Sequence, residues 1–240
     1  MNSINNSLKK SFSWEMCGSP FFLVLLVLYI TFSLLGTVLL YKLVVVGPGL
    51  APGGLFVLPF VLLIESVIAE AYGYKISRLL IWFLFLSMTV FTVSALIIIH
   101  LPSPPYWHLQ SAFNKVFDPI VISAPSLVAG LFTSWFINLY GITKLKILFQ
   151  GRFFWLRSIF SSLIGGFIGV IVVFGLAYGH GISFSELKDL ILTDYFVRIL
   201  YAVFGGGPAW LLVMLIKRKE KIDVYDIGTN FNPFKLTIKD

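Results

Sequence analysis

Six long apolar runs constrain the fold of this chain more than any other feature of its sequence. Each run is about 20 residues long, the length that a helix needs to cross the hydrocarbon core of a bilayer. Only a helix satisfies its backbone hydrogen bonds within one such segment, so the sequence predicts an all-α, polytopic membrane protein with six transmembrane helices. The runs cover residues 21–41, 55–72, 79–100, 120–141, 158–179 and 195–216.

The composition agrees with a chain that lies mostly in a membrane. Hydrophobic residues make up 58% of the 240 residues and charged residues 12%, whereas a soluble globular domain carries about 25% charge. The first run is too long for the apolar core of a signal peptide, so we expect it to be retained. We predict a cytoplasmic N-terminal segment (1–20), a six-helix membrane domain (21–216) and a cytoplasmic C-terminal tail (217–240).

Lysine and arginine residues gather at alternate ends of the six runs. They precede the first run, separate the second run from the third and the fourth from the fifth, and follow the sixth. The positive-inside rule then places both termini in the cytoplasm. The net charge of +7 therefore indicates topology, and we expect the lipid bilayer as a partner and no nucleic acid.

The sequence carries no motif for catalysis or for a metal cofactor. The single cysteine, Cys17, excludes an intrachain disulfide and a cysteine metal cluster. The three histidines lack the spacing of metal ligands, and no phosphate-binding loop, serine-hydrolase motif or zinc-protease motif is present. We therefore expect neither an enzyme nor a bound cofactor.

Glu65 lies near the middle of the second apolar run. A carboxylate at that depth costs about 2.5–3.5 kcal/mol unless it faces protein, water or a ligand. We predict that Glu65 binds a ligand, a proton or a counter-charge. Glu70 follows five residues later, about 140° around a helix, and so does not share its face. It is either a second ligand group or the partner of Lys75 and Arg78 in an interfacial ion pair.

Three further positions carry polar or aromatic groups within the runs. Ser134 and Asn138 are one turn apart on the fourth run, with Trp135 beside them. Asn138 either binds a ligand or bridges two helices. Arg198 lies one turn into the sixth run and either reaches the outer interface or pairs with Glu65 or a substrate carbonyl.

Small residues and helix breakers mark two more segments. Ser158, Ser162, Gly165 and Gly169 repeat at helical spacing on the fifth run, which is typical of close helix packing. The segment 205–208, Gly-Gly-Gly-Pro, interrupts the sixth run. It is either a simple kink or a break of the kind that marks binding sites in transporters.

The connections between the runs differ in character. Residues 101–119 are rich in proline and aromatic residues, and we expect a loop that covers a cavity mouth. Residues 181–194 are expected to contain a short amphipathic helix. Residues 47–54, rich in glycine and proline, are expected to form a loop, and the polar segment 223–240 is expected to be flexible.

The segment 58–78, LPFVLLIESVIAEAYGYKISR, resembles the queuosine-precursor transporter family, also called the vitamin-uptake-transporter-like family. The matching positions are Pro59, Glu70, Tyr72, Gly73, Tyr74, Lys75 and Arg78. Weaker matches extend the resemblance over residues 37–226, through Lys42, Lys144, Arg157, Asp194 and Pro208.

This resemblance implies a six-helix fold similar to the vitamin-binding S-components of uptake systems. It also implies import of 7-deazaguanine precursors of the tRNA base queuosine across the inner membrane. The chain departs from the family pattern, because the family acid at Ser66 is shifted to Glu65. Polar family residues on the fourth run fall on Trp135 and Asn138, and those on the fifth fall on Gly166, Gly169 and Val170. The chain is similar to a divergent member.

Together these features predict a substrate cavity near the middle of the membrane. Glu65 would accept the N–H groups of a guanine-like edge, and Arg198 or Asn138 would donate to its carbonyl. Trp135 or an aromatic side chain of Tyr106–Trp107 would stack on the ring. The predicted substrate-binding residues are Glu65, Glu70, Arg198, Asn138, Trp135 and Ser134. Alternatives are a transporter of another small heterocycle, or a structural or assembly protein that keeps the fold without transport. A homo-oligomer and an external energising partner are both compatible with the sequence.

Overall fold

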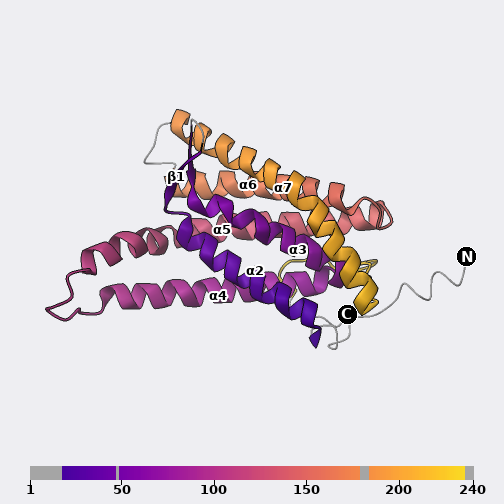
Figure 1. Ribbon diagram of the computed structural model, residues 1–240, viewed down its shortest axis with the longest axis horizontal. Helices are drawn as coiled ribbons and strands as arrows, with labels where there is room; N and C mark the ends of the chain where they lie inside the picture. Colours follow the sequence, from indigo (N-terminus) through magenta and orange to yellow (C-terminus); the bar gives the residue numbers. More distant parts are fainter. Residues whose placement is uncertain (1–17, 47–48, 179–183, 236–240) are drawn as a thin grey trace, which may run out of the picture.

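The computed structural model describes residues 18–46, 49–178 and 184–235 (Figure 1). Within these residues six helical segments are long and apolar enough to cross a membrane, which confirms the predicted number. The helices are α2 (Pro20–Leu39), α3 (Leu58–Tyr72), α4 (Tyr74–His100), α5 (Gln110–Leu148), α6 (Phe154–Tyr178) and α7 (Phe184–Glu220), with a short 3-10 helix η2 (Gly53–Phe56) and strands β1 (Leu43–Val46) and β2 (Gly49–Pro52).

Helix α3 is the central element of the bundle. It contacts α2, α4, α5, α6 and α7, and Figure 1 shows it running between α2, α5 and α7. Nearly all of its residues are buried, Glu65 and Glu70 among them. Since both acids sit on a helix enclosed by protein, lipid is excluded from them and their partners must come from neighbouring helices.

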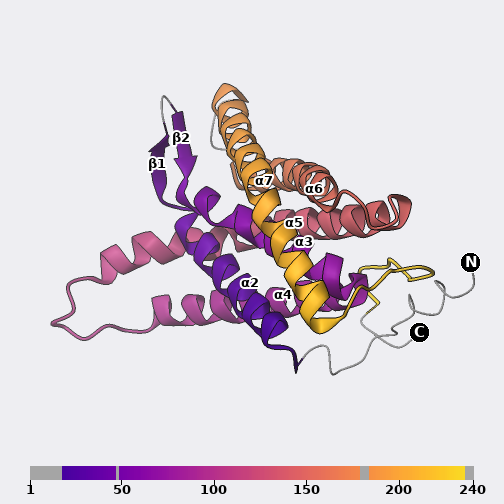
Figure 2. The ribbon, with the colours of Figure 1, turned by 45° about the vertical axis from the view of Figure 1, so that its right-hand side comes forward.

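The first and last membrane helices end on the same face of the molecule. Ser19, at the start of α2, donates a hydrogen bond to Glu220 at the end of α7. Tyr72, at the end of α3, donates to the other oxygen of Glu220 over 2.7 Å. We call this side the terminal face, and the side that holds β1 and β2 the hairpin face (Figures 1 and 2). The start of α2 and the end of α7 thus lie on one face, and the location of this face in the cytoplasm stays a prediction from charge.

Helix α5 is longer than the apolar run that predicts it. Its 39 residues span about 58 Å at 1.5 Å per residue, nearly twice the hydrocarbon core of about 30 Å. Residues 110–119 are therefore helix, and the loop predicted over 101–119 is wrong for this part. The α4–α5 connection also extends away from the other helices instead of covering a cavity mouth (Figures 1 and 2).

Helix α7 runs unbroken through the segment Gly205–Pro208, which the sequence marks as a kink or a break. A larger residue at the first of these positions would have to displace the Leu63 side chain of α3, because a Cβ on Gly205 would lie 2.3 Å from one of its methyl groups. Gly205 thus serves the close packing of α7 on α3. The separate amphipathic helix predicted over 181–194 is instead the first part of α7 from Phe184 onward; residues 181–183 lie outside the described residues.

The segment between α2 and α3 is also more ordered than predicted. Strands β1 and β2 pair in antiparallel register, with Leu43 opposite Pro52 and Val45 opposite Leu50. Gly54 then lets η2 approach α2 closely, since a Cβ there would lie 2.5 Å from the carbonyl oxygen of Gly36. The predicted loop is thus a small hairpin on an otherwise helical fold.

The predicted flexibility of the C-terminal tail is wrong for residues 223–235. The segment 221–235, which we call the strap, lies across the terminal face against α3, α4 and α5. Its side chains and backbone carbonyls accept hydrogen bonds from helices that are more than 70 residues away in sequence. Residues 236–240 lie outside the described residues.

Candidate binding site between α3, α5 and α6

A chain of three buried polar side chains links the central helices. Asn138 on α5 donates its amide to the Oε2 atom of Glu65 over 2.8 Å. Ser162 on α6 donates to the carbonyl oxygen of the Asn138 side chain over 3.1 Å. Asn138 thereby bridges α3 and α6, and Glu65 and Asn138, predicted separately, meet in one place.

Several polar atoms in this region have no partner among the described residues. They include Glu65 Oε1, Tyr29 Oη and Ser66 Oγ, and all three residues are at most 1% exposed. A buried polar group without a hydrogen bond costs about 1–3 kcal/mol. Such atoms are therefore the natural contacts of a polar ligand, and Glu65 still offers a free acceptor oxygen beside its bond to Asn138.

Tyr29 was not singled out from the sequence, although it brings a phenol into the middle of the first apolar run. Its ring lies 6.3 Å from the ring of Trp135, measured between centroids. Trp135 also contacts Phe85 edge-on, with centroids 6.3 Å apart. Trp135 is thus packed between Tyr29 of α2 and Phe85 of α4.

A small cavity of about 30 Å³ lies toward the hairpin face from this polar chain. On each of the three helices, a residue that lines the cavity lies four or seven positions from a member of the polar chain, toward the hairpin face. These pairs are Leu58 and Glu65, Ser134 and Asn138, and Gly166 and Ser162. At 1.5 Å per residue, the cavity is therefore about 6–10 Å from the polar chain along the same helix faces. Its lining is Leu40, Leu58, Leu127, Gly130, Leu131, Ser134, Gly166, Gly169, Val170, Val173, Asp194 and Arg198.

Arg198 reaches this cavity but does not pair with Glu65, which corrects one of the two partners predicted for it. Its Nε atom lies 2.5 Å from Oδ2 of Asp194, one turn earlier on α7. Asp194 is 3% exposed, so the pair is largely desolvated. The Arg198 side chain passes beside Gly166, where a Cβ would lie 3.3 Å from Cδ. A guanidinium so placed can donate to a ligand in the cavity.

Glu70 lies in a separate ion cluster at the terminal face. Its carboxylate is 2.9 Å from Arg157, 2.6 Å from Lys217 and 3.8 Å from Lys146. The predicted ion pair therefore exists in kind, but these partners come from α5, α6 and α7 and not from the residues that follow Glu70 in sequence. With three cations around it, the Glu70 carboxylate links α3 to α5, α6 and α7.

Asp223 completes this ion cluster from the strap. It lies 2.8 Å from Lys146 and 2.9 Å from Lys217. Burial alone would raise the pKa of Asp223, but the two ammonium groups outweigh burial and hold it below the ordinary value. Asp223 is therefore ionised at neutral pH, and the strap is tied to the cations that also bind Glu70.

Comparison with known proteins places the fold in a family. Residues 52–213, more than half of the chain, match the family model described as "Putative vitamin uptake transporter". The chain belongs to this family. It is therefore a multi-pass membrane transporter for the uptake of a small molecule. Neither the curated proteins nor the solved structures contain a match.

Three residues without polar side chains line the cavity of the uptake transporter at positions where the resemblance implies polar ones. Gly166, Gly169 and Val170, on which the resemblance places polar family residues, all line it. A Cβ on Gly169 would lie 2.6 Å from that of Ser134, so a larger residue does not fit there without a shift of α5. Gly166 faces only the flexible Arg198 side chain and has room for one. The cavity is thus less polar than the family pattern implies.

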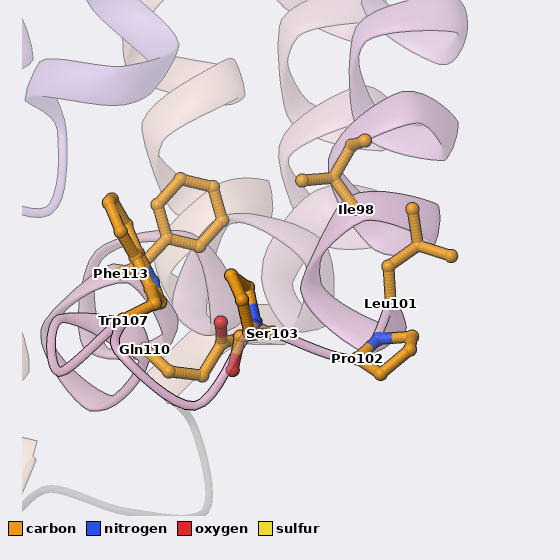
Figure 3. A pocket seen from close by; sticks show the side chains of 8 residues that line it. Ile98, Leu101, Pro102, Ser103, Trp107, Gln110 and Phe113 are labelled. Atoms are coloured by element: carbon orange, nitrogen blue, oxygen red, sulfur yellow. The ribbon is translucent and has the colours of Figure 1, made fainter.

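A second cavity of the uptake transporter, of about 200 Å³, lies at the tip of the α4–α5 connection. Figure 3 shows that Trp107 and Phe113 lie together on one side of it, with Ile98 and Leu101 on the other. The lining comes from α4, α5 and their connection only, and it holds no charged group. Tryptophan at a membrane surface is typical of interfacial anchoring, so this cavity is not a candidate for the transport site.

Proposed function

We propose that the transporter imports a queuosine precursor of the 7-deazaguanine type across the inner membrane and binds it beside Glu65. The observation that carries this proposal is the free Oε1 atom of Glu65, held within a fully buried carboxylate whose other oxygen is fixed by Asn138. A carboxylate oxygen that is free, fixed and shielded from water is suited to accept the N–H groups of a heterocycle edge.

The neighbouring groups would complete the recognition. The Tyr29 hydroxyl and the Ser66 hydroxyl each have a hydrogen to donate to a ring nitrogen or carbonyl. Arg198 would meet the substrate earlier, at the cavity on the hairpin side. Because Trp135 is enclosed by Tyr29 and Phe85, we assign ring stacking to Tyr29 and give Trp135 the role of supporting it.

Transport by this site requires the helices to separate. A cavity of about 30 Å³ has room for a water molecule, whereas ligand pockets measure about 300–1,000 Å³. The structure is therefore a closed state of the proposed cycle. Opening would begin at the hairpin face. The cavity there is lined by Leu58, Ser134 and Gly166, and it lies one to two helical turns from Glu65.

The basic residues at the terminal face lead us to propose that this face is cytoplasmic, as the positive-inside rule predicts. In this orientation the hairpin face receives the substrate. Proton coupling at Glu65, facilitated diffusion and an energising partner would each use the same binding site.

Another small heterocycle is the second candidate substrate, because the cavity is lined by Gly166, Gly169 and Val170 where the family pattern has polar groups. A buried donor or acceptor left unpaired costs about 1–3 kcal/mol, so a guanine edge would bind less tightly here. Gly166→Ser restores a hydroxyl at the position with room for it. Improved deazapurine uptake by this variant would favour a degraded queuosine-precursor site, and reduced uptake would favour the second candidate.

The decisive experiment uses cells that cannot make the queuosine precursor. The transporter is expressed in them, 7-deazaguanine precursors are supplied outside, and queuosine in tRNA is measured. We expect rescue by the native chain and loss of rescue with Glu65→Gln. The matched control is Asp189→Asn, which removes a carboxylate charge at an exposed position of α7. Absence of rescue by a correctly inserted native chain would contradict the proposed substrate.

A further inference from the structure

The strap, residues 221–235, closes the terminal face through contacts with three helices. Tyr74, the first residue of α4, donates its backbone N–H to Asp226 over 2.8 Å. Lys146 of α5 donates to the backbone carbonyl of Val224 over 2.6 Å, and Val224 itself donates to the carbonyl of Ala71 on α3 over 3.4 Å. The strap thus joins α3, α4 and α5 where these helices end.

Further along, the strap is held by buried donors of α4. Arg78, 1% exposed, donates to the carbonyls of Asn230 and Asn232 over 3.2 Å and 3.0 Å. Trp82 donates its indole N–H to the carbonyl of Pro233 over 2.8 Å. Hydrogen bonds from charged donors are worth about 1.5–3 kcal/mol. The two bonds from Arg78 therefore stabilise the strap in this one position on α4.

Two aromatic side chains anchor the strap between α4 and α5. The Phe231 ring lies 4.8 Å from that of Tyr74 and 5.6 Å from that of Tyr140, and Lys144 lies over it at 4.2 Å. Phe234 lies 6.0 Å from Trp82 and 6.0 Å from Phe132. Phe231 packs between Tyr74 of α4 and Tyr140 of α5, whereas Phe234, 66% exposed, contacts Trp82 and Phe132 from outside, so the strap bridges α4 and α5 at this face.

Two routes connect the strap to the candidate binding site. A series of ring contacts runs from Phe234 through Phe132, Phe85 and Trp135 to Tyr29. The second route is the ion cluster, in which Asp223 shares Lys146 and Lys217 with Glu70 on α3. Helices α3 and α5 carry Glu65 and Asn138, so opening toward the terminal face would disturb both routes.

We propose that the strap is the gate of the terminal face, and that its release opens the Glu65 site on that side. The inference rests on the proposed binding site at Glu65. In the docked position the strap holds α3, α4 and α5 together, and the site is closed to the terminal face. In the released position the Ser162–Asn138–Glu65 chain becomes accessible from that face.

The test measures accessibility with reporter cysteines in the full chain, so it does not depend on the substrate. Cys17→Ser removes the native thiol, and Val224→Cys or Ser162→Cys then supplies a single reporter in the strap or in the site. A membrane-impermeant maleimide is added from the side of the C-terminus. Phe231→Ala removes the aromatic anchor, and Ile227→Ala, at a strap residue 74% exposed, is the matched control.

We expect Phe231→Ala to raise the labelling rate at both reporters by at least tenfold, while Ile227→Ala leaves both unchanged. Faster labelling at Val224→Cys with unchanged labelling at Ser162→Cys would overturn the proposal, because the strap would be released without opening the site. Trp82→Phe removes a second strap contact. If Phe231→Ala, alone and together with Trp82→Phe, leaves the labelling rate at Val224→Cys unchanged, the proposal is overturned as well. If labelling follows the expectation but deazaguanine rescue fails, the gate stands and the proposed substrate is wrong.

Discussion

Two carboxylates on one helix, five residues apart, have different surroundings and allow a paired prediction. Glu65 has one amide partner and a free oxygen, whereas Glu70 is surrounded by three cations. Glu65→Gln keeps an oxygen that can accept from Asn138, so folding should be unaffected. Uptake should fall at least about tenfold, the loss expected for about 1.4 kcal/mol of binding energy. Initial uptake rates at limiting substrate, with protein level as control, measure this.

Glu70→Gln should lower the stability of the protein and leave substrate binding intact, the opposite of Glu65→Gln. Removing one member of a buried ion pair costs about 3–5 kcal/mol, because the remaining charges stay buried without compensation. We expect a markedly lower unfolding temperature of the detergent-purified protein and less protein in the membrane. Any Glu70→Gln protein that folds should still bind substrate. A stable Glu70→Gln protein with no uptake would place Glu70 in the binding site, against the assignment made here.

The sequence predicts Glu65 and Asn138 as site residues, but it predicts neither their mutual hydrogen bond nor the presence of Tyr29. The cost of burying a carboxylate or an amide in a membrane marks Glu65 and Asn138 without knowledge of any contact. Their mutual bond joins residues 73 positions apart, and helix order along the chain does not determine such pairs. Tyr29 was missed because tyrosine in an apolar run is common and carries no comparable penalty.

At the scale of elements, the packing of α6 on α5 depends on glycine. A Cβ on Gly165 would lie 2.5 Å from the carbonyl oxygen of Ser134 and 3.0 Å from the backbone nitrogen of Asn138. Gly165→Ala should therefore force the helices apart and cost about 1–3 kcal/mol. Gly175→Ala on the same helix is the control, since a Cβ there meets no described atom within 4 Å. Thermal unfolding in detergent should separate the two variants by several degrees.

Hydropathy predicted every membrane helix and its centre, but the helix ends less well. A proline in a sequence suggests the end of a helix, yet Pro119 and Pro125 lie inside α5, and Pro208 lies inside α7. A single proline removes one hydrogen bond. The packing of α5 against α4 and α6, and of α7 against α3 and α6, outweighs that loss. The polar composition of residues 223–240 likewise suggested a flexible tail. It could not reveal the partners of the strap, because these lie on helices distant in sequence.

For the whole molecule, the proposed orientation predicts labelling from opposite sides. In a Cys17→Ser background, a cysteine replacing Pro104 at the tip of the α4–α5 connection should react with an impermeant reagent outside intact cells. A cysteine replacing Ile227, 74% exposed on the strap, should react only after the membrane is opened. Both positions are exposed, so the difference reports their side of the membrane. Reaction of the Ile227 cysteine from outside would reverse the assigned topology.

The strap also has a consequence for the synthesis and membrane insertion of the protein. Residues 221–235 are the last described part of the chain to leave the ribosome, and their partners lie on helices made long before. Arg78 and Trp82 therefore lack these strap contacts while α5, α6 and α7 insert. The terminal face is completed only once residues 221–235 have been made. A chain cut short before residue 221 would still contain the six membrane helices, but it would lack the contacts that join α3, α4 and α5 on this face.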